Sequence, residues 1–162
     1  MKSCLIALGV ICGVILLAVV ALVVYAVTIG TQLDTSSHEY VNASNKAIIS
    51  TWSEKELYSR ASPELEASTT TEEVEKWFKL FRQLGALQIY ESAEGGSHIS
   101  ITTQNGKVIT GNYTAGATFE NGKAIIETRV IQHDGEWKVL SFRIDSKTFL
   151  DFMDDQPADD TE

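Results

Sequence analysis

DGEWKVLSFRID, residues Asp134 to Asp145, reads as a turn that opens directly into one alternating strand near the end of the chain. Gly135 and its polar neighbours have the composition of a tight turn, and the residues after it alternate as those of a strand do. The two predicted faces carry Trp137 and Val139 on one side and Leu140, Phe142 and Ile144 on the other. Because both faces are apolar, we expect one to be covered by helix and the other by a partner or by residues 147–150.

The same period of two extends back to Gly85, and turn signals divide this part of the chain into strands. The turn signals are Glu94-Gly95-Gly96, Gln104-Asn105-Gly106 and Asn121-Gly122, and Asn-Gly pairs are typical of hairpins. The predicted strands are 98–103, 107–119, 123–132 and the closing strand, with a further possible strand at 86–91. Strands joined by tight turns predict an antiparallel meander, and Gly111 and Gly116 predict a bend in its longest strand.

Helical spacing dominates the chain before Gly85. One predicted helix carries Tyr40, Val41, Ala47, Ile48 and Trp52, and a weaker helical piece covers 54–59 before a break at Ser62-Pro63. Thr70 and Glu73 form a capping-box pattern, and the helix behind them carries Val74, Trp77, Phe78, Phe81 and Leu84. This aromatic stripe predicts core packing, with the wall of a ligand cavity as the alternative. The predicted fold class is α+β, with helices packed on a curved antiparallel sheet.

The N-terminal segment, residues 1–30, predicts a transmembrane anchor. No charged residue occurs from Cys4 to Gly30, and this run is longer than the roughly 20 apolar residues that cross a bilayer. A cleaved signal peptide is the alternative, with Val24-Tyr25-Ala26 as its small-residue site. Such peptides have apolar cores of only about 7–15 residues, so we expect the anchor to be retained.

Charge around the anchor predicts the orientation of the chain. Lys2 precedes the span, whereas the first charges after it are acidic, and positive charge tends to stay on the cytoplasmic side. We therefore expect a single-pass protein with a cytoplasmic N-terminus and its domain in the periplasm or at the cell exterior. The predicted parts after the anchor are a linker at 31–37, the domain at 38–150 and a flexible acidic tail at 151–162.

Composition excludes several classes of function. Beyond Gly30 the chain has 22 acidic residues against 12 basic ones, a net formal charge of −10, which argues against nucleic acid as a partner. The two cysteines, Cys4 and Cys12, both lie in the anchor, so we expect no disulfide or thiol chemistry in the domain. The three histidines lack the spacing of a metal site, and the sequence has no nucleophile elbow and no phosphate loop. We therefore expect no metal and no cofactor.

The predicted elements are a long helix, a shorter broken one, an aromatic-rich helix and a curved sheet that ends in Gly135-Glu136-Trp137-Lys138-Val139. The order of these elements resembles the nuclear transport factor 2-like superfamily, the cystatin-related cone fold. The resemblance covers roughly Ser37 to Lys147 and rests on the order of elements rather than on a catalytic signature. It implies a cone whose open end holds a small molecule or whose sheet pairs with a second copy. Among the members of this superfamily, the chain looks most like membrane-anchored bacterial proteins without a characterised activity.

Candidate ligand-binding residues follow from this resemblance and from the strand pattern. Glu127 and Arg129 share one strand face, either as an ion pair inside the cone or as exposed residues. His98 alternates with apolar neighbours and is a candidate base or an exposed side chain, and the hydroxyl of Tyr113 is a candidate ligand contact or part of the packing. In the anchor, Gly9 and Gly13 have the small-residue spacing of paired membrane helices.

Three functions are compatible with the sequence. The favoured hypothesis is a non-catalytic domain outside the cytoplasm that binds a small molecule or a protein partner. The second is an assembly factor of an envelope complex, similar to the inner-membrane component of type IV secretion systems that shares this layout, which would associate with itself or with an envelope protein. The third is an enzyme like the isomerases and dehydratases of the superfamily, which needs an acid and a base inside a dry cone.

Overall fold

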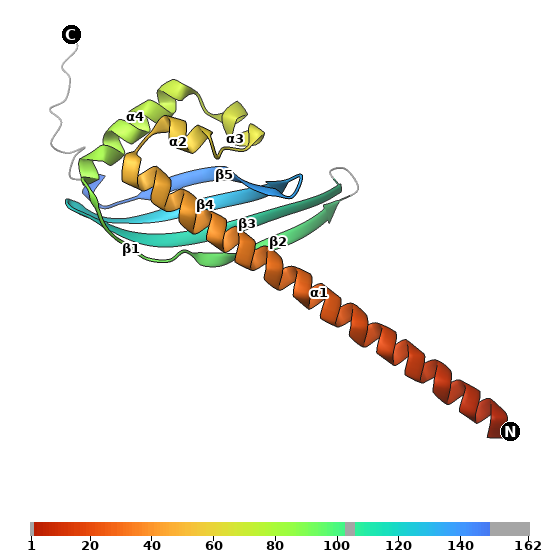
Figure 1. Ribbon diagram of the computed structural model, residues 1–162. Helices are drawn as coiled ribbons and strands as arrows, with labels where there is room; N and C mark the ends of the chain where they lie inside the picture. The colour runs from red at the N-terminus through yellow and green to blue at the C-terminus, as the bar shows by residue number, and fades with distance from the viewer. Residues whose placement is uncertain (1, 103–105, 150–162) are drawn as a thin grey trace, which may run out of the picture. The chain divides into compact units, whose positions relative to one another are not determined.

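The computed structural model describes residues 2–102 and 106–149, with only the backbone of residues 2–12, 14 and 102. The predicted tail, 151–162, lies outside the described residues. The chain divides after Thr35 into two units, and its fold is α+β (Figure 1). The elements are α1 (Lys2–Thr51), α2 (Glu54–Tyr58), α3 (Pro63–Ser68), α4 (Thr71–Phe81), a 3-10 turn (Arg82–Leu84), β1 (Leu87–Tyr90), β2 (Glu94–Thr102), β3 (Gly106–Phe119), β4 (Gly122–His133) and β5 (Glu136–Asp145).

The first unit is the N-terminal part of α1, which is long and apolar enough to cross a membrane. Every side chain from Ile15 to Thr28 is exposed, and a continuous apolar surface of this size is typical of a segment that contacts a membrane or another apolar partner. These properties are those of a transmembrane or signal anchor. Gly13 has open space around it, and Gly9 lies four residues earlier, on the same side of the helix.

The predicted linker, 31–37, is helical. Three threonine hydroxyls, those of Thr28, Thr31 and Thr35, donate hydrogen bonds to backbone carbonyls one turn earlier. The distance between the hydroxyl oxygen and the carbonyl oxygen is 2.8–3.2 Å. Threonine side chains that bond back in this way satisfy helical carbonyls instead of competing with the helix. The polar composition of the segment therefore does not interrupt α1, although the two units of the chain meet within it.

The second unit contains one antiparallel sheet in the order β1-β3-β4-β5, with β2 also paired to β3. β2 lies along Gly106–Thr114 of β3, and β1 lies along Ala117–Phe119. β1 and β2 therefore share one side of β3, and the predicted meander from β2 to β5 is confirmed.

Gly95 and Gly96 form part of β2, so the prediction that they make a turn was wrong. Gly95 has φ +153°, and a Cβ at this position would lie 2.0 Å from the carbonyl oxygen of Asn112. Glycine is required here because β2 approaches β3 closely. In the sequence, a glycine that serves this purpose inside a strand looks the same as a glycine in a turn.

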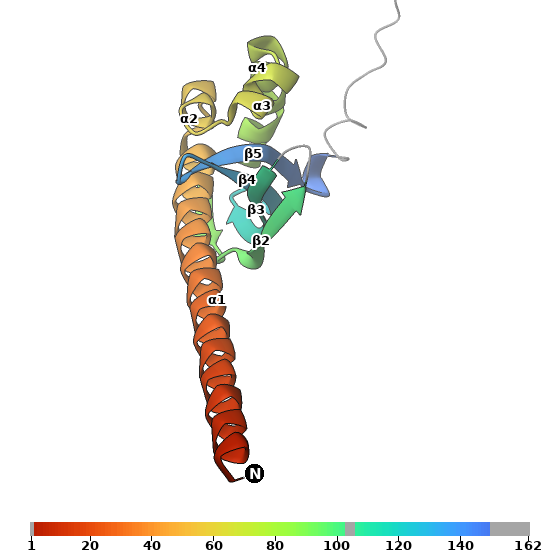
Figure 2. The same ribbon diagram turned by 90° about the vertical axis from the view of Figure 1, so that its right-hand side faces the viewer.

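One face of the sheet, the inner face, is covered by helices (Figures 1 and 2). Val41, Ile48 and Ile49 of α1 are buried, as are Ala115 of β3 and Ile126 of β4. α4 begins with the predicted capping box: Thr70 Oγ1 accepts from the Glu73 amide, and the Glu73 carboxylate accepts from the Thr70 amide. α3 was not predicted, because Pro63 reads as a break, yet proline is well tolerated in the first turn of a helix.

An aromatic cluster fills the core between the helices and one end of the sheet. Trp52 closes α1 and its ring lies 5.6 Å from the rings of both Phe81 and Phe119, and 6.0 Å from Phe78. Trp52 adopts φ +46°, a conformation that costs a bulky residue energy unless its surroundings hold it. These aromatic contacts hold Trp52 in place and fix the end of α1.

β5 contains a bulge that overturns the expectation of two apolar faces. Val130 pairs with Val139 and the preceding Arg129 pairs with Ser141, so Leu140 is an extra residue. Because an extra residue reverses the alternation, Phe142 and Ile144 lie opposite the inner-face residues of β4, on the same face as Trp137 and Val139. β5 therefore has a single apolar face, and no second cover is required.

Candidate functional site

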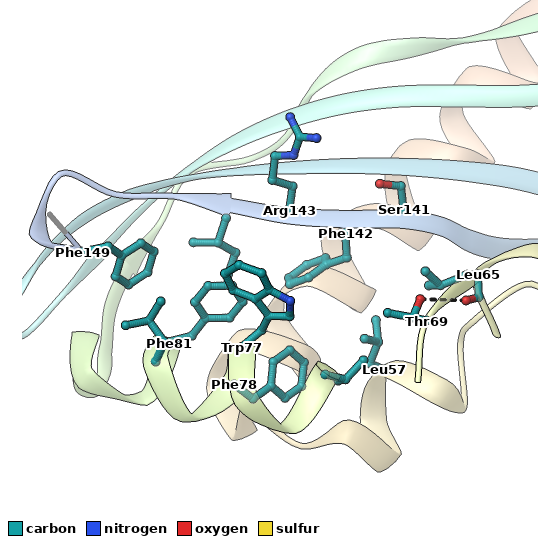
Figure 3. Close-up of a pocket in the computed structure, with 13 residues that line it drawn as sticks. Leu57, Leu65, Thr69, Trp77, Phe78, Phe81, Ser141, Phe142, Arg143 and Phe149 are labelled. Atoms are coloured by element: carbon teal, nitrogen blue, oxygen red, sulfur yellow. Dashed lines mark hydrogen bonds between the residues drawn. The ribbon is translucent and has the colours of Figure 1, made fainter. Parts of the chain in front are cut away.

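An open cavity of about 420 Å³ lies between the helices and β5. Figure 3 shows its aromatic side chains gathered below β5 and above α4. The walls come from α2, α3, α4, β5 and the segment after β5, and the lining residues are Leu57, Leu65, Thr69, Val74, Trp77, Phe78, Leu80, Phe81, Ser141, Phe142, Arg143, Ile144 and Phe149.

α4 supplies one wall because its apolar surface is wider than the core requires. Val74, Phe78 and Phe81 are buried, whereas Trp77 is 55% exposed at the edge of the cavity. Leu80 lies one turn beyond Trp77 and is half-buried. The helix therefore presents two adjoining apolar stripes: both line the cavity, and the buried stripe also belongs to the core.

The bulge in β5 supplies the opposite wall. It turns Phe142 and Ile144 toward the helices, as the pairing of Phe142 with Thr128 and of Ile144 with Ile126 shows. If Leu140 were paired regularly with β4 instead of being bulged, alternation after Val139 would direct both side chains to the outer face. Phe149 closes the end of the cavity, with its ring 5.4 Å from that of Phe81.

The chemistry of the cavity is that of apolar contact. Ser141 and Arg143 line it through their backbone, because their side chains project to the other side of β5 (Figure 3). The Thr69 hydroxyl is occupied by a hydrogen bond to the Leu65 carbonyl, with 2.8 Å between the oxygens. Among the described lining residues, no titratable side chain faces into the cavity. The arrangement can hold an apolar molecule and supplies neither a general acid nor a general base.

Three of the four predicted ligand-binding residues lie on the outer face. Glu127 and Arg129 are exposed on β4, and His98 is exposed on β2. Arg129 Nε donates to Asn112 Oδ1 at 3.1 Å, and Glu127 Oε2 lies 3.9 Å from Nη1 of Arg143. Of the two alternatives that the sequence left open for Glu127 and Arg129, the structure shows the exposed one. Each side chain has its partner on a neighbouring strand.

Tyr113 is buried on the inner face, and its hydroxyl lies 2.6 Å from the Ser37 hydroxyl of α1. It belongs to a set of polar contacts that holds α1 against the sheet. In the same set, Trp137 Nε1 donates to Ser36 Oγ at 3.0 Å, and Thr128 donates to the fully buried Asn45 at 2.7 Å. The structure therefore does not bring Tyr113 together with the three outer-face residues.

A second, polar hollow lies beside α1 and the β1–β2 connection, lined in part by His38, Asn42 and Tyr90. Its polar atoms bond to one another: Tyr90 donates to Asn42 Oδ1 at 2.9 Å, and the Ala93 amide donates to the same oxygen at 2.9 Å. Burial raises the pKa of Tyr90, partly offset by its hydrogen bond from Asn45. These contacts fasten α1 to the connection and leave the apolar cavity as the better candidate site.

The residues that form the cavity were only partly predictable. The aromatic stripe of α4, with Trp77, Phe78 and Phe81, was predicted to be core, with the wall of a ligand cavity as the alternative. Trp77, at the edge of the cavity, fits that alternative. No role in a cavity was predicted for Leu57, Phe142 or Phe149. For Phe142 the sequence assigned the wrong face, because nothing in alternating residues marks the position of a bulge.

No protein-family model, curated protein or solved structure matches this chain. The relation to the nuclear transport factor 2-like superfamily therefore stays a prediction that rests on the order of the elements.

Proposed function

We propose that this chain is a membrane-anchored protein whose domain, displayed outside the cytoplasm, binds a small apolar molecule without transforming it. The observation that carries the proposal is the cavity between α4 and β5, with its aromatic walls. Its volume of about 420 Å³ falls in the range of about 300–1,000 Å³ that small-molecule sites occupy.

Charge narrows the class of ligand. The part of the chain beyond Gly30 carries a net formal charge of −10, which repels anions over distances of about a Debye length. The described walls offer no cation directed into the cavity that would overcome this repulsion. A neutral aromatic or aliphatic molecule therefore suits the site better than a carboxylate or a phosphate.

The layering supports the further proposal that the domain has the cone fold of the nuclear transport factor 2-like superfamily. Three helical pieces follow α1 and precede a curved antiparallel sheet. All of them lie with the part of α1 after Thr35 on one face of that sheet (Figure 1). In this proposal the cavity between α4 and β5 is the open end of the cone.

Native mass spectrometry of the full chain, released from its own membranes without denaturant, tests the binding function. We expect extra mass on the wild-type chain and on an Ile125→Ala variant, because Ile125 is 52% exposed on the outer face. Trp77→Ala should raise the dissociation constant about tenfold and so lower the occupied fraction, since removal of one aromatic wall costs about 1.4 kcal/mol of contact.

The exposure of Trp77 makes this comparison a test of binding rather than of folding. A wild-type chain without extra mass, or equal occupancy of the Trp77→Ala and Ile125→Ala variants, would contradict the proposal. An identified ligand that carries a carboxylate or a phosphate would contradict the preference for neutral molecules and leave the cavity as the binding site.

A further inference from the structure

The free edges of the sheet are protected to different degrees. β5 is covered at its middle by the connection between α2 and α3: the Ser62 amide donates to the Val139 carbonyl at 2.8 Å, and the Val139 amide donates to the Arg60 carbonyl at 2.7 Å. β1 is four residues long, and its register is broken between Leu87 and Ile89. Short, irregular or covered edges resist pairing with other strands.

Among the residues that the structure describes, β2 shows none of these protections at its outer edge between Ile99 and Ile101. It is nine residues long and keeps a regular register with β3 throughout. Within the described part of the chain, no backbone hydrogen bond joins Ile99, Ser100 or Ile101 to any segment other than β3. A long, regular edge of this kind is a template for another strand.

The side chains of β2 add an apolar and uncharged surface to this edge. Ile99 is 45% exposed and Ile101 is 78% exposed. From Gly95 to Thr102 the strand contains no acidic residue, no lysine or arginine and no proline, although the rest of the domain is strongly acidic. Charged or proline residues normally guard an exposed edge strand, and their absence marks this edge as one that is paired.

We propose that β2 pairs antiparallel with β2 of a second copy of this chain. A two-fold axis at Ser100 would place Ile99 opposite the partner's Ile101 and Ile101 opposite the partner's Ile99. Residues directly opposite in an antiparallel pair share a face and lie about 4.5–5.5 Å apart between Cβ atoms. The four isoleucines then form one apolar cluster, and the two sheets join into one continuous sheet.

A second copy suits this edge better than an unrelated strand. The pairing is isologous, so the same patch serves both subunits and no new complementary surface is required. Two domains with a charge of about −10 each repel one another. The stretch of β2 from Gly95 to Thr102 has no acidic side chain, so they can approach along it without like charges opposite each other. Anchoring in one membrane raises the effective concentration of copies.

Disulfide formation in membranes that contain the full chain tests the proposed pairing. The background replaces the two native cysteines, Cys4→Ser and Cys12→Ser. Ser100→Cys in this background should give the highest yield of disulfide-linked dimer, because residues at a two-fold axis lie within the Cα separation of about 4.4–6.8 Å that a disulfide needs. Glu127→Cys, exposed on the outer face of β4, is the matched control and should give at least tenfold less dimer.

A charge at the edge provides the second measurement. Ile101 lies opposite Lys107 of β3, so Ile101→Glu adds a cross-strand ion pair and leaves the hairpin intact. It also places two negative charges in the proposed isoleucine cluster. The Ser100→Cys dimer should fall at least tenfold in the Ile101→Glu variant and stay unchanged in the matched Ile125→Glu variant.

Three results would overturn the proposal. The first is an equal dimer yield at Ser100→Cys and Glu127→Cys, and the second is an equal yield in the Ile101→Glu and Ile125→Glu variants. The third is a Ser100→Cys adduct with a different protein in place of the dimer. Ligand mass on the Ile101→Glu variant is measured separately, so failure of the pairing and failure of the binding function are distinguishable.

Discussion

At the scale of single residues, the contact between Asn45 and Thr128 is decisive for how α1 sits on the sheet. Both side chains are fully buried, and 2.7 Å separates the Thr128 hydroxyl from Asn45 Oδ1. The amide of Asn45 also donates to the Tyr90 hydroxyl at 3.3 Å. A buried polar group has a large desolvation cost unless it is bonded, so each partner depends on the other.

Asn45→Ala and Thr128→Val should each lower the free energy of unfolding by about 1–3 kcal/mol, because each leaves a buried polar partner unsatisfied. The double variant should lose less than the sum of the two losses, since the second change removes a group that is already unpaired. Denaturant unfolding of the four chains measures this coupling. Strict additivity would show that the two side chains do not stabilise one another.

Sequence patterns predicted single residues unevenly. The capping pair of Thr70 and Glu73 was predicted because both partners lie in one helical turn. The side of the sheet on which Glu127 and Arg129 lie was left open, since alternation shows only that two residues share a face and not which face is covered. The partner of Tyr113 was not predictable, because Ser37 is 76 residues away in the chain.

At the scale of elements, α4 combines a strong start with an apolar surface that serves both the core and the cavity. Its capping box places Glu73 Oε2 at 2.9 Å from the amide nitrogen of Thr70 and at 2.9 Å from its hydroxyl oxygen. The bond from the Thr70 amide, followed by the bond from its hydroxyl, lowers the pKa of the Glu73 carboxyl from its ordinary value of 4.5.

The stability of α4 should therefore depend on pH in a defined direction. A carboxyl with a lowered pKa in the folded state stabilises it fully above its unfolded value and loses this contribution as the pH falls through the lowered value. The free energy of unfolding, followed from about pH 6 to about pH 3, should decrease more steeply for the wild type than for Glu73→Gln. Glutamine keeps an acceptor for the Thr70 amide and does not titrate, so parallel curves would contradict a role for the ionised cap.

The elements themselves were predicted better than their details. Periodicity located α4, β3, β4 and β5 because each pattern is a local property of the chain. The bulge in β5 and the place of Gly95 inside β2 depend on the neighbouring strand, so neither leaves a distinct local signal. α3 was missed for a different reason, since Pro63 is compatible with both a break and a first helical turn.

At the scale of the whole molecule, the core and the sheet both belong to the second unit of the chain. Ser36 and Ser37 of α1 hydrogen-bond to side chains of the sheet, and Val41 lies in the core. The first unit carries an exposed apolar stretch long enough to span a membrane, and the second has its own hydrophobic interior.

A fragment that begins at Asp34 should fold and unfold cooperatively. Its Tm should lie within about 5 °C of that of the second unit in the full chain, which corresponds to a difference of about 1 kcal/mol in the free energy of unfolding. A fragment that begins at Asn45 lacks Ser37, Val41 and Ser44, and should lose cooperative unfolding. Circular dichroism during heating measures both. Loss of structure in the longer fragment would show that the N-terminal helix stabilises the domain.

The extra residue at Leu140 also bears on how the length of this protein can vary among its relatives. Loss of one residue from a regularly paired strand reverses every side chain beyond it, and such a deletion is rarely tolerated. At Leu140 the chain already has one residue more than β4 requires, so a shorter chain would keep Phe142 opposite Thr128 and Ile144 opposite Ile126. Homologous chains can therefore differ by one residue here and share the same interior, while a flatter β5 would change the shape of the cavity wall.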